Sequence, residues 1–504
     1  MKVSPVLFLC LLACPLLSQR PAPARIDEVG RQYADATFPE LIELLSLPND
    51  AHFPVDIERN IAWCEAAFAR RDFSLQRIET ATVPLLLAQR NVVEADKTVL
   101  VYLQVDGQPT DTSRWEQANP FLPVIKRRSD ANEAWQVVDS YTPEELLDDD
   151  RVFARSASDA KGPIGMFLAA LDAVADLGLA PSYNLKVIMD FEEEIGSPRL
   201  PAAVERHQEL LAADMLIIFD GPLHPSNQPT LKFGARGIAD VTLTTYGPID
   251  PQHSGHYGNY APNPALALAQ LLASMKDADG RVLIPGYYDG VHLDDSTRKL
   301  LNTVPDDEAE IRDRLQIGRV DSVGRSYQES IQYPSLNIRG MRSGWIDDEV
   351  RTIIPAWARA ELDLRLVLES NPDRLIQLVR DHIAGQGYHV LDREPTKAER
   401  LAHPRIATLT SRVFYQSFRT DFDTEVGQWL QRALTYVHGQ KPVMIRMTGG
   451  SIPIAPFVVT LDIPAVTVPT VNMDNNQHSP NENLRIGNYR DGVKTMIGIL
   501  TEPL

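Results

Sequence analysis

Acidic residues and one histidine lie close to apolar runs of the sequence, in positions where they could hold a divalent metal ion. The acidic residues are Asp106, Asp159, Glu192, Glu193, Glu194 and Asp220, the histidine is His478, and Gln104 lies beside them as a neutral polar residue. Several of them stand directly after an apolar run, and sites in open α/β sheets form at the carboxyl ends of the strands. Carboxylates that converge there repel one another, so a positive charge has to offset them. Carboxylates with an imidazole suit a divalent cation, and the pattern therefore predicts a metal site.

Each residue also has an ordinary alternative when it is taken singly. Asp159 could cap the helix that follows it, because aspartate is a favoured N-cap residue. The acidic triplet 192–194 could be a solvated face, and His478 could be an unremarkable loop histidine. Their number and their shared association with the ends of apolar runs favour the metal site over these alternatives.

The elements that would position these residues follow from hydrophobic periodicity. Short apolar runs at 99–104, 185–191 and 215–219 read as strands, and the segment 162–179 between the first two reads as a helix. Strands that alternate with helices indicate an α/β fold with a mixed, mostly parallel sheet. From about residue 237 to 400 the strands alternate apolar and polar residues, as antiparallel strands with one wet face do. We therefore expect an inserted α+β domain over 237–400 and a catalytic domain split into 25–236 and 401–504.

After residue 400 the sequence again shows a helical pattern and then apolar runs, as in the first part of the α/β domain. The segment 421–439 is predicted as a helix, and 456–468 as apolar strands. The segment 26–50 is predicted as two helical pieces, the second of which ends at Pro48.

Composition excludes some classes of protein. The chain has 504 residues and a formal charge of −19, so two domains are expected and nucleic-acid binding is not. No segment after the N-terminus is long and apolar enough to be read as a membrane span.

Residues 1–24 read as an export signal. One lysine precedes a short apolar stretch, and the segment ends in an A-x-A-like site, Ala22-Pro23-Ala24. A membrane anchor is the first alternative, although the apolar stretch is shorter than the ~20 residues that span a bilayer. Lipoprotein processing at Cys14 is the second. The export signal predicts a mature chain in the periplasm or outside the cell. Cys64 is the one cysteine outside this segment, so the mature chain is expected to lack an internal disulfide.

The motifs around these residues resemble those of the family-20 metallopeptidases, which include carnosinase-type dipeptidases, carboxypeptidase G and the acetylornithine and succinyl-diaminopimelate deacylases. The segments similar to the main motifs are VDGQP (105–109), SASDAKGP (156–163), EEEIGS (192–197) and HSPNE (478–482). The segments QHSGHYGN, PSLNIRG, RTIIP, LDLRLV and GGSIPI are similar to further motifs in the same order, as in the dipeptidase branch. The resemblance covers nearly all of the chain after the leader.

The resemblance implies a zinc centre and assigns a role to each residue in it. Asp159 would bridge two metal ions, Glu194 and His478 would complete the first site, and Asp220 would belong to the second. Glu193 would be the general base that takes a proton from water. Asp106 would orient an imidazole ligand or steady the site.

The resemblance also implies how substrate is held. His253 would reach across a homodimer, formed through the inserted domain, to stabilise the oxyanion. Arg365 would grip the carboxylate of a peptide, a task that suits the guanidinium fork, with Gly450 and Ser451 beside it. The alternative for Arg365 is a surface ion pair, because it lies in an alternating strand.

Gln104 departs from the pattern, since the family has a histidine ligand of the second metal ion at this position. A neutral amide oxygen is a weaker donor than imidazole, so the second site would be all oxygen and would prefer Mn²⁺, Mg²⁺ or Ca²⁺ to zinc. Three outcomes remain open: one tightly held zinc, a mixed-metal pair, or a weakened enzyme kept for binding. A hydrogen bond from the Gln104 amide to Asp106, two residues away on the same face, is a further expectation.

The sequence thus leads us to expect a secreted metal-dependent exopeptidase that hydrolyses dipeptides or short peptides with a free C-terminal carboxylate. An N-acyl-amino-acid deacylase would use the same groups and is the alternative among enzymes. A degenerate homologue that binds peptides is the alternative outside enzymes.

Overall fold

The apolar runs that precede the acidic residues form the centre of an eight-stranded sheet. The computed structural model describes residues 20–129 and 134–504. The strand order is β1-β2-β7-β3-β8-β20-β9-β19, and the central pairs β7–β3, β3–β8 and β8–β20 are parallel. The strands are β1 (Ser74–Ile78), β2 (Leu85–Arg90), β3 (Thr98–Gln104), β7 (Asn184–Asp190), β8 (Met215–Ile218), β9 (Thr230–Lys232), β19 (Val443–Ile445) and β20 (Ala465–Thr467). The expected mixed, mostly parallel sheet is confirmed.

Helices cover both faces of this sheet because its central strands are apolar on both sides. Val99, Val101 and Leu103 of β3 pack into one core, and Leu100 and Tyr102 pack into another. The first core also takes side chains of α1 (Pro23–Leu45), α2 (Pro54–Ala69), α3 (Lys161–Asp176), α13 (Glu425–His438) and α15 (Ile486–Thr501). The second takes side chains of α4 (Leu200–Arg206), α5 (Gln208–Leu211) and α14 (Ala455–Leu461).

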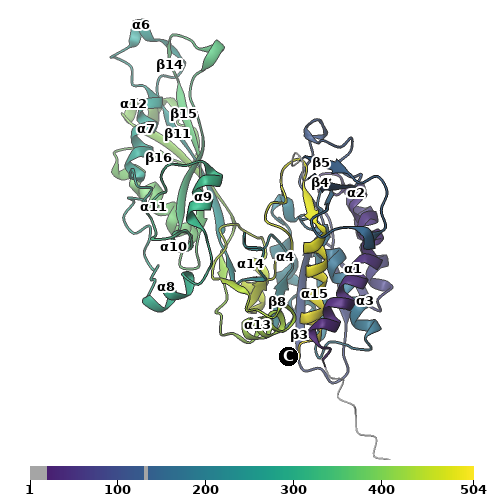
Figure 1. The fold of residues 1–504 in the computed structure, drawn as a ribbon. Coiled ribbons are helices and arrows are strands. Elements are labelled where there is room, and N and C mark those ends of the chain that lie inside the picture. Colours follow the sequence, from purple (N-terminus) through teal and green to yellow (C-terminus); the bar gives the residue numbers. More distant parts are fainter. Residues whose placement is uncertain (1–19, 130–133) are drawn as a thin grey trace, which may run out of the picture.

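A second body is inserted between β9 and α13 and stands apart from the first in Figure 1. Its five-stranded sheet has the order β13-β15-β11-β17-β16. The strands are β11 (Gly237–Tyr246), β13 (Ser335–Arg342), β15 (Trp357–Leu366), β16 (His389–Leu391) and β17 (Ile406–Tyr415). Alternate residues of β11 and β15 point into one core with α7 (Pro264–Met275) and α11 (Pro372–Gly385). The alternation therefore does mark antiparallel strands with one wet face.

The boundary that the sequence places after residue 400 falls too early. β17 pairs along most of its length with β11 and so belongs to the sheet of the inserted body. The chain returns to the larger body only after Tyr415, where β18 (Phe418–Arg419) pairs with β10 (Gly234–Ala235). The inserted body is thus closed by a strand that lies after the predicted boundary.

Two local expectations are wrong. The segment 26–50 does not break into two helices, because α1 runs through Pro39 as one helix with one face buried against the core. The segment 456–461, expected as a strand, is part of α14, which has a proline in its first turn and ends at Asp462 in the left-handed conformation. Helix packing on the sheet overrides the β propensity of the two valines there.

The remaining elements are short. They are β4 (Val124–Arg128), β5 (Trp135–Val137), β6 (Arg151–Phe153), β12 (Gln252–His253), α6 (Ser254–Tyr257), α8 (Asp295–Leu301), α9 (Glu308–Leu315), α10 (Tyr327–Ser330), β14 (Ile353–Ile354), α12 (Lys397–Ala402) and β21 (Asn483–Arg485). β21, β6, β4 and β5 make a four-stranded sheet beside the main one.

The predicted leader, with Cys10 and Cys14, lies outside the described residues up to position 19. Residues 20–24, which the prediction also assigned to it, pack on the larger body. Arg20 pairs with Glu502 and lies over the ring of Tyr436, whose hydroxyl donates to Pro21 O at 3.1 Å. Cleavage after Ala24 would remove these contacts and the first two residues of α1. Cys64 is free and buried, and in the described part of the chain no helix has the length and hydropathy to cross a bilayer.

Candidate active site

Asp159, Glu194 and His478 come together at the carboxyl edge of the eight-stranded sheet. His478 Nε2 lies 2.9 Å from Asp159 Oδ2 and 3.3 Å from Glu194 Oε2. One possible ligand atom from each residue lies within 4.8 Å of the ligand atoms of the other two. The two carboxylate side chains are almost enclosed, whereas the imidazole is about half exposed, at 53%. Two carboxylates and one imidazole at this spacing fit one divalent cation.

Asp159 is fixed by the last motif of the sequence. The buried Glu482 carboxylate accepts hydrogen bonds from the backbone N–H groups of Ser156, Ser158 and Asp159, at 3.0, 3.0 and 2.9 Å. It also accepts from Arg155 Nη1 at 2.6 Å. Sequence reasoning gave Glu482 no role, although an acidic residue at the end of a matched motif was the available signal.

Asp106 holds the turn that carries the two glutamates. Its carboxylate oxygens accept from the backbone N–H groups of Glu193 and Glu194 at 2.9 and 3.0 Å. These residues form a 3-10 turn directly after β7. Asp106 therefore positions Glu193 and Glu194 through their main chain, and it does not pair with Gln104 as we had expected.

Burial and mutual repulsion dominate the electrostatics of the site. Burial, with Glu194 and then Asp220 nearby, holds the pKa of the Glu193 carboxyl well above its usual range. Burial and Asp159 raise the pKa of Glu194 to about 8 and that of Asp220 to about 7. The hydrogen bond to Asp159 raises the pKa of His478 to about 9. A cation in the cluster would offset this repulsion, and this supports a metal centre.

On the side of the cluster that faces β3 and β9, the polar side chains are an amide and an ammonium instead of carboxylates and an imidazole. Gln104 Nε2 donates to Asp159 Oδ1 at 2.6 Å, and Gln104 Oε1 is buried with no hydrogen-bond partner among the described residues. Lys232, at the end of β9, donates to Pro222 O at 2.8 Å. Burial lowers the pKa of Lys232 to about 8, while the negative charge of Asp220 acts in the opposite direction. The sequence analysis did not single out Lys232.

A cationic group joins the two bodies near the cluster. Arg365 on β15 donates to Ser451 Oγ at 2.8 Å, and the backbone of Arg236 donates to Gly450 O at 3.2 Å. Burial and the neighbouring Arg365 charge lower the pKa of Arg236 to about 10. The structure thus brings Arg365, Gly450 and Ser451 together and adds Arg236, which sequence reasoning missed.

Tyr415, at the end of β17, connects this group to the cluster electrostatically. Burial and the Glu193 charge raise the pKa of Tyr415 to about 12, with the Arg365 charge acting in the opposite direction. The glutamate and the arginine therefore both lie close enough to act on one phenol. Tyr415 was missed because no strand was predicted from the sequence at 406–415, where β17 lies.

His253 is not brought to this site within one chain. It lies on β12, next to α6, at the end of the inserted body farthest from the eight-stranded sheet (Figure 1). Its ring is exposed, accepts from Gly255 N at 3.0 Å and packs edge-on against His256. The prediction that His253 acts in a second subunit is compatible with this position.

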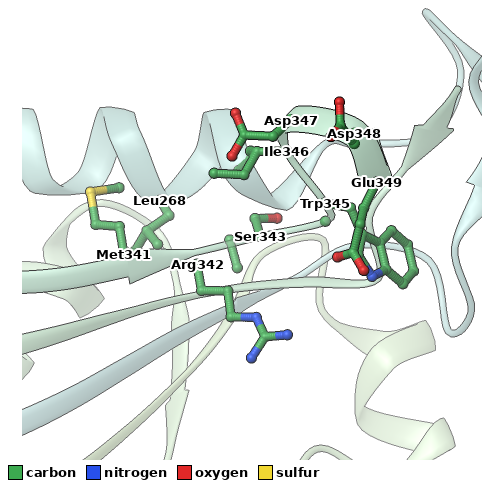
Figure 2. Close-up of a pocket in the computed structure, with 12 residues that line it drawn as sticks. Leu268, Met341, Arg342, Ser343, Trp345, Ile346, Asp347, Asp348 and Glu349 are labelled. Atoms are coloured by element: carbon green, nitrogen blue, oxygen red, sulfur yellow. The ribbon is translucent and has the colours of Figure 1, made fainter. Parts of the chain in front are cut away.

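A pocket of about 670 Å³ lies on the inserted body, away from the acidic cluster. Figure 2 shows it between Leu268 of α7 and Met341 and Arg342 at the end of β13, with Trp345 and Glu349 at its other side. None of the site residues that the sequence predicts line this pocket.

Comparisons with known proteins agree with this arrangement. The sequence model of the peptidase family M20/M25/M40 matches residues 128–502. The chain is 25% identical to the Cys-Gly metallodipeptidase dug1 of Schizosaccharomyces pombe, over 85% of each chain. It is also 25% identical to the human Beta-Ala-His dipeptidase, over 99% of this chain and 96% of the other.

A solved structure shares the fold. The M20 family metallo-carboxypeptidase Sso-CP2 from Sulfolobus solfataricus matches with a TM-score of 0.76 and 26% identity, over 92% of this chain and 98% of that one. The family match spans well over half of the sequence and includes all of the acidic cluster except Gln104 and Asp106. The chain therefore belongs to the peptidase family M20/M25/M40 and is a metallopeptidase.

Proposed function

We propose that this metallopeptidase hydrolyses dipeptides or short peptides and requires their free C-terminal carboxylate. The observation that carries the proposal is the hydrogen bond between Arg365 and Ser451, which sets a guanidinium at the junction of the two bodies. The charges of Arg365 and Glu193 both act on Tyr415, which relates this guanidinium to the acidic cluster. A guanidinium that is already oriented suits a planar carboxylate. The names of the relatives, a Cys-Gly metallodipeptidase and a Beta-Ala-His dipeptidase, support a substrate of this size.

In this proposal Asp159, Glu194 and His478 hold zinc, and Glu193 moves the proton. A divalent cation held there would polarise the scissile carbonyl and lower the pKa of an adjacent water. Glu193 accepts the proton of that water and then delivers it to the leaving amine. Asp106 keeps Glu193 in place through its backbone N–H, and Arg365 fixes the far end of the substrate.

The different roles proposed for Glu193 and Glu194 can be distinguished by substitution. Glu193→Gln should keep its zinc but lose turnover by about 10² to 10⁴, the usual range for a general acid–base group. Glu194→Gln should lose zinc, because it removes a ligand charge. Metal analysis after dialysis and kcat on a dipeptide panel measure both. Equal zinc content in the two variants would overturn this assignment.

Arg365 provides the test of the exopeptidase reading. Arg365→Met should raise KM for dipeptides by roughly 10- to 150-fold, the value of a charge-assisted hydrogen bond. It should leave the much weaker hydrolysis of C-terminally amidated dipeptides unchanged, since those substrates have no carboxylate to bind.

Arg359→Met is the matched control, because Arg359 lies on the same strand but is exposed and bonds Thr244 instead. An Arg365→Met variant that loses both substrates equally would argue against the proposed carboxylate site. Hydrolysis of N-acetyl amino acids in preference to dipeptides would favour a deacylase.

We further propose a homodimer formed through the inserted body. β13 is an edge strand of the five-stranded sheet, and its Ile338 and Met341 are 42% and 54% exposed. Leu266 on the neighbouring α7 is 60% exposed. An open strand edge with apolar side chains is a surface that a second copy can extend.

Mixing two inactive variants tests whether His253 acts in the partner. His253→Ala and Glu193→Gln should each be nearly inactive as pure dimers. Dimers re-formed from an equal mixture should regain roughly a quarter of the wild-type activity, because half are mixed and each mixed dimer has one intact site. A monomer by light scattering that is fully active, or a mixture with no regained activity, would contradict the shared site.

We also propose that the protein is exported and that its leader is removed. We expect the protein recovered from its own cells to lie outside the cytoplasm and to lack residues 1–24, as the leader composition suggests. The intact mass of the exported protein measures this directly. A lipid-modified N-terminus at Cys14 would show the alternative processing, and an intact cytoplasmic chain would refute export.

A further inference from the structure

Two hydrogen-bond donors occupy the side of the cluster where the family resemblance implies a second metal ion. That ion would be held by residue 104, Asp159 and Asp220. Asp159 presents Oδ2 to His478 and Oδ1 to Gln104, so its two oxygens do face two different places. The first place is lined by metal ligands alone, whereas at the second the Gln104 amide and the Lys232 ammonium lie beside Asp159 and Asp220.

Gln104 presents an N–H group, not an oxygen, to this second place. The contact between Gln104 Nε2 and Asp159 Oδ1 is 2.6 Å. The reversed amide would set an oxygen against a carboxylate oxygen at that distance, so the hydrogen-bond network assigns the donor end to Asp159. The Asp159 oxygen that would bridge to a second ion is therefore already bonded to a proton donor.

Lys232 supplies a positive charge beside the remaining ligand. Its ammonium donates to Pro222 O, two residues after Asp220, and lies 3.4 Å from where a Cβ would stand on Gly221. Both contacts place the ammonium at the two residues that directly follow Asp220, so a positive charge stands next to the Asp220 carboxylate. A lysine is out of place in the apolar segment 230–233 unless its charge is used.

We propose that this chain is a one-metal enzyme, in which the Gln104 amide and the Lys232 ammonium take the place of the second ion. The inference rests on the proposed metal centre at Asp159, Glu194 and His478. Lys232 adds a positive charge to that of one divalent cation, facing the carboxylates of Asp159, Glu194, Asp220 and Glu193. A second divalent cation would face the Lys232 charge and an N–H donor, and both are unfavourable for it.

Metal stoichiometry of four purified proteins tests the proposal. The proteins are the wild type, Gln104→His, Lys232→Leu and the double variant Gln104→His/Lys232→Leu. Each is titrated with zinc by calorimetry and analysed for metal after dialysis. We expect one zinc per chain in the wild type and two in the double variant. The second zinc should bind the double variant at least about tenfold more tightly than Gln104→His alone, because the lysine charge is gone.

Lys186→Leu is the matched control. Like Lys232, Lys186 is partly buried and donates to backbone carbonyls, here those of Leu210 and Ala212. Its pKa is lowered by burial alone, with no contribution from a carboxylate. Combined with Gln104→His, it should leave the affinity for a second zinc the same as in Gln104→His alone. Thermal unfolding confirms that each variant is folded before it is counted.

The outcomes separate the two proposals. Two zinc ions in the wild type, or a folded double variant that still binds one, would overturn the role given to Gln104 and Lys232. No zinc in the wild type would instead refute the metal centre of the proposed function. A zinc-soaked wild-type crystal provides the independent reading: one anomalous peak beside Asp159, Glu194 and His478 supports the inference, and a second peak beside Asp220 overturns it.

Discussion

The repulsion among buried carboxylates at one edge of the sheet is the constraint on which the site depends. Glu193, Glu194 and Asp220 each have a raised pKa because burial and neighbouring negative charge disfavour their ionised forms. Such a cluster is costly to fold unless its charges are met. The surrounding structure meets them in two ways, with backbone N–H groups and with cations.

Backbone donors do the positioning. Asp106 and Glu482 each fix a turn by accepting hydrogen bonds from several of its backbone N–H groups. One turn carries Asp159 and the other carries the two glutamates. Because these turns are held by the main chain, the ligand side chains are set in place before any ion binds, which lowers the cost of binding it.

The sequence predicted the parts of this arrangement that depend on local pattern and motif order. Strands ending in acidic residues predicted carboxylates at one edge of the sheet, since parallel strands bring their carboxyl ends together. The family resemblance, through its motifs, implied that Asp159, Glu194 and His478 share one ion. Lys232 and Tyr415 were not found because they approach from β9 and β17, whose neighbours in space are distant in sequence. Periodicity did not reveal β17 either, because its side chains are buried as one block at 406–409 and exposed after it, without the alternation of a strand that has one wet face.

The junction of the two bodies determines where the proposed carboxylate-binding group lies. Arg365 belongs to the inserted sheet, whereas Ser451 belongs to the larger body, so their hydrogen bond forms only while the two bodies are in contact. Further contacts across the same junction, such as His224 with Asp306 and Arg446 with Gln332, set the separation of the bodies. The distance from the guanidinium to the acidic cluster is then a property of the junction. The function we propose uses this separation, since a carboxylate one or a few residues from the scissile bond would have to reach Arg365 while the bond lies at the acidic cluster.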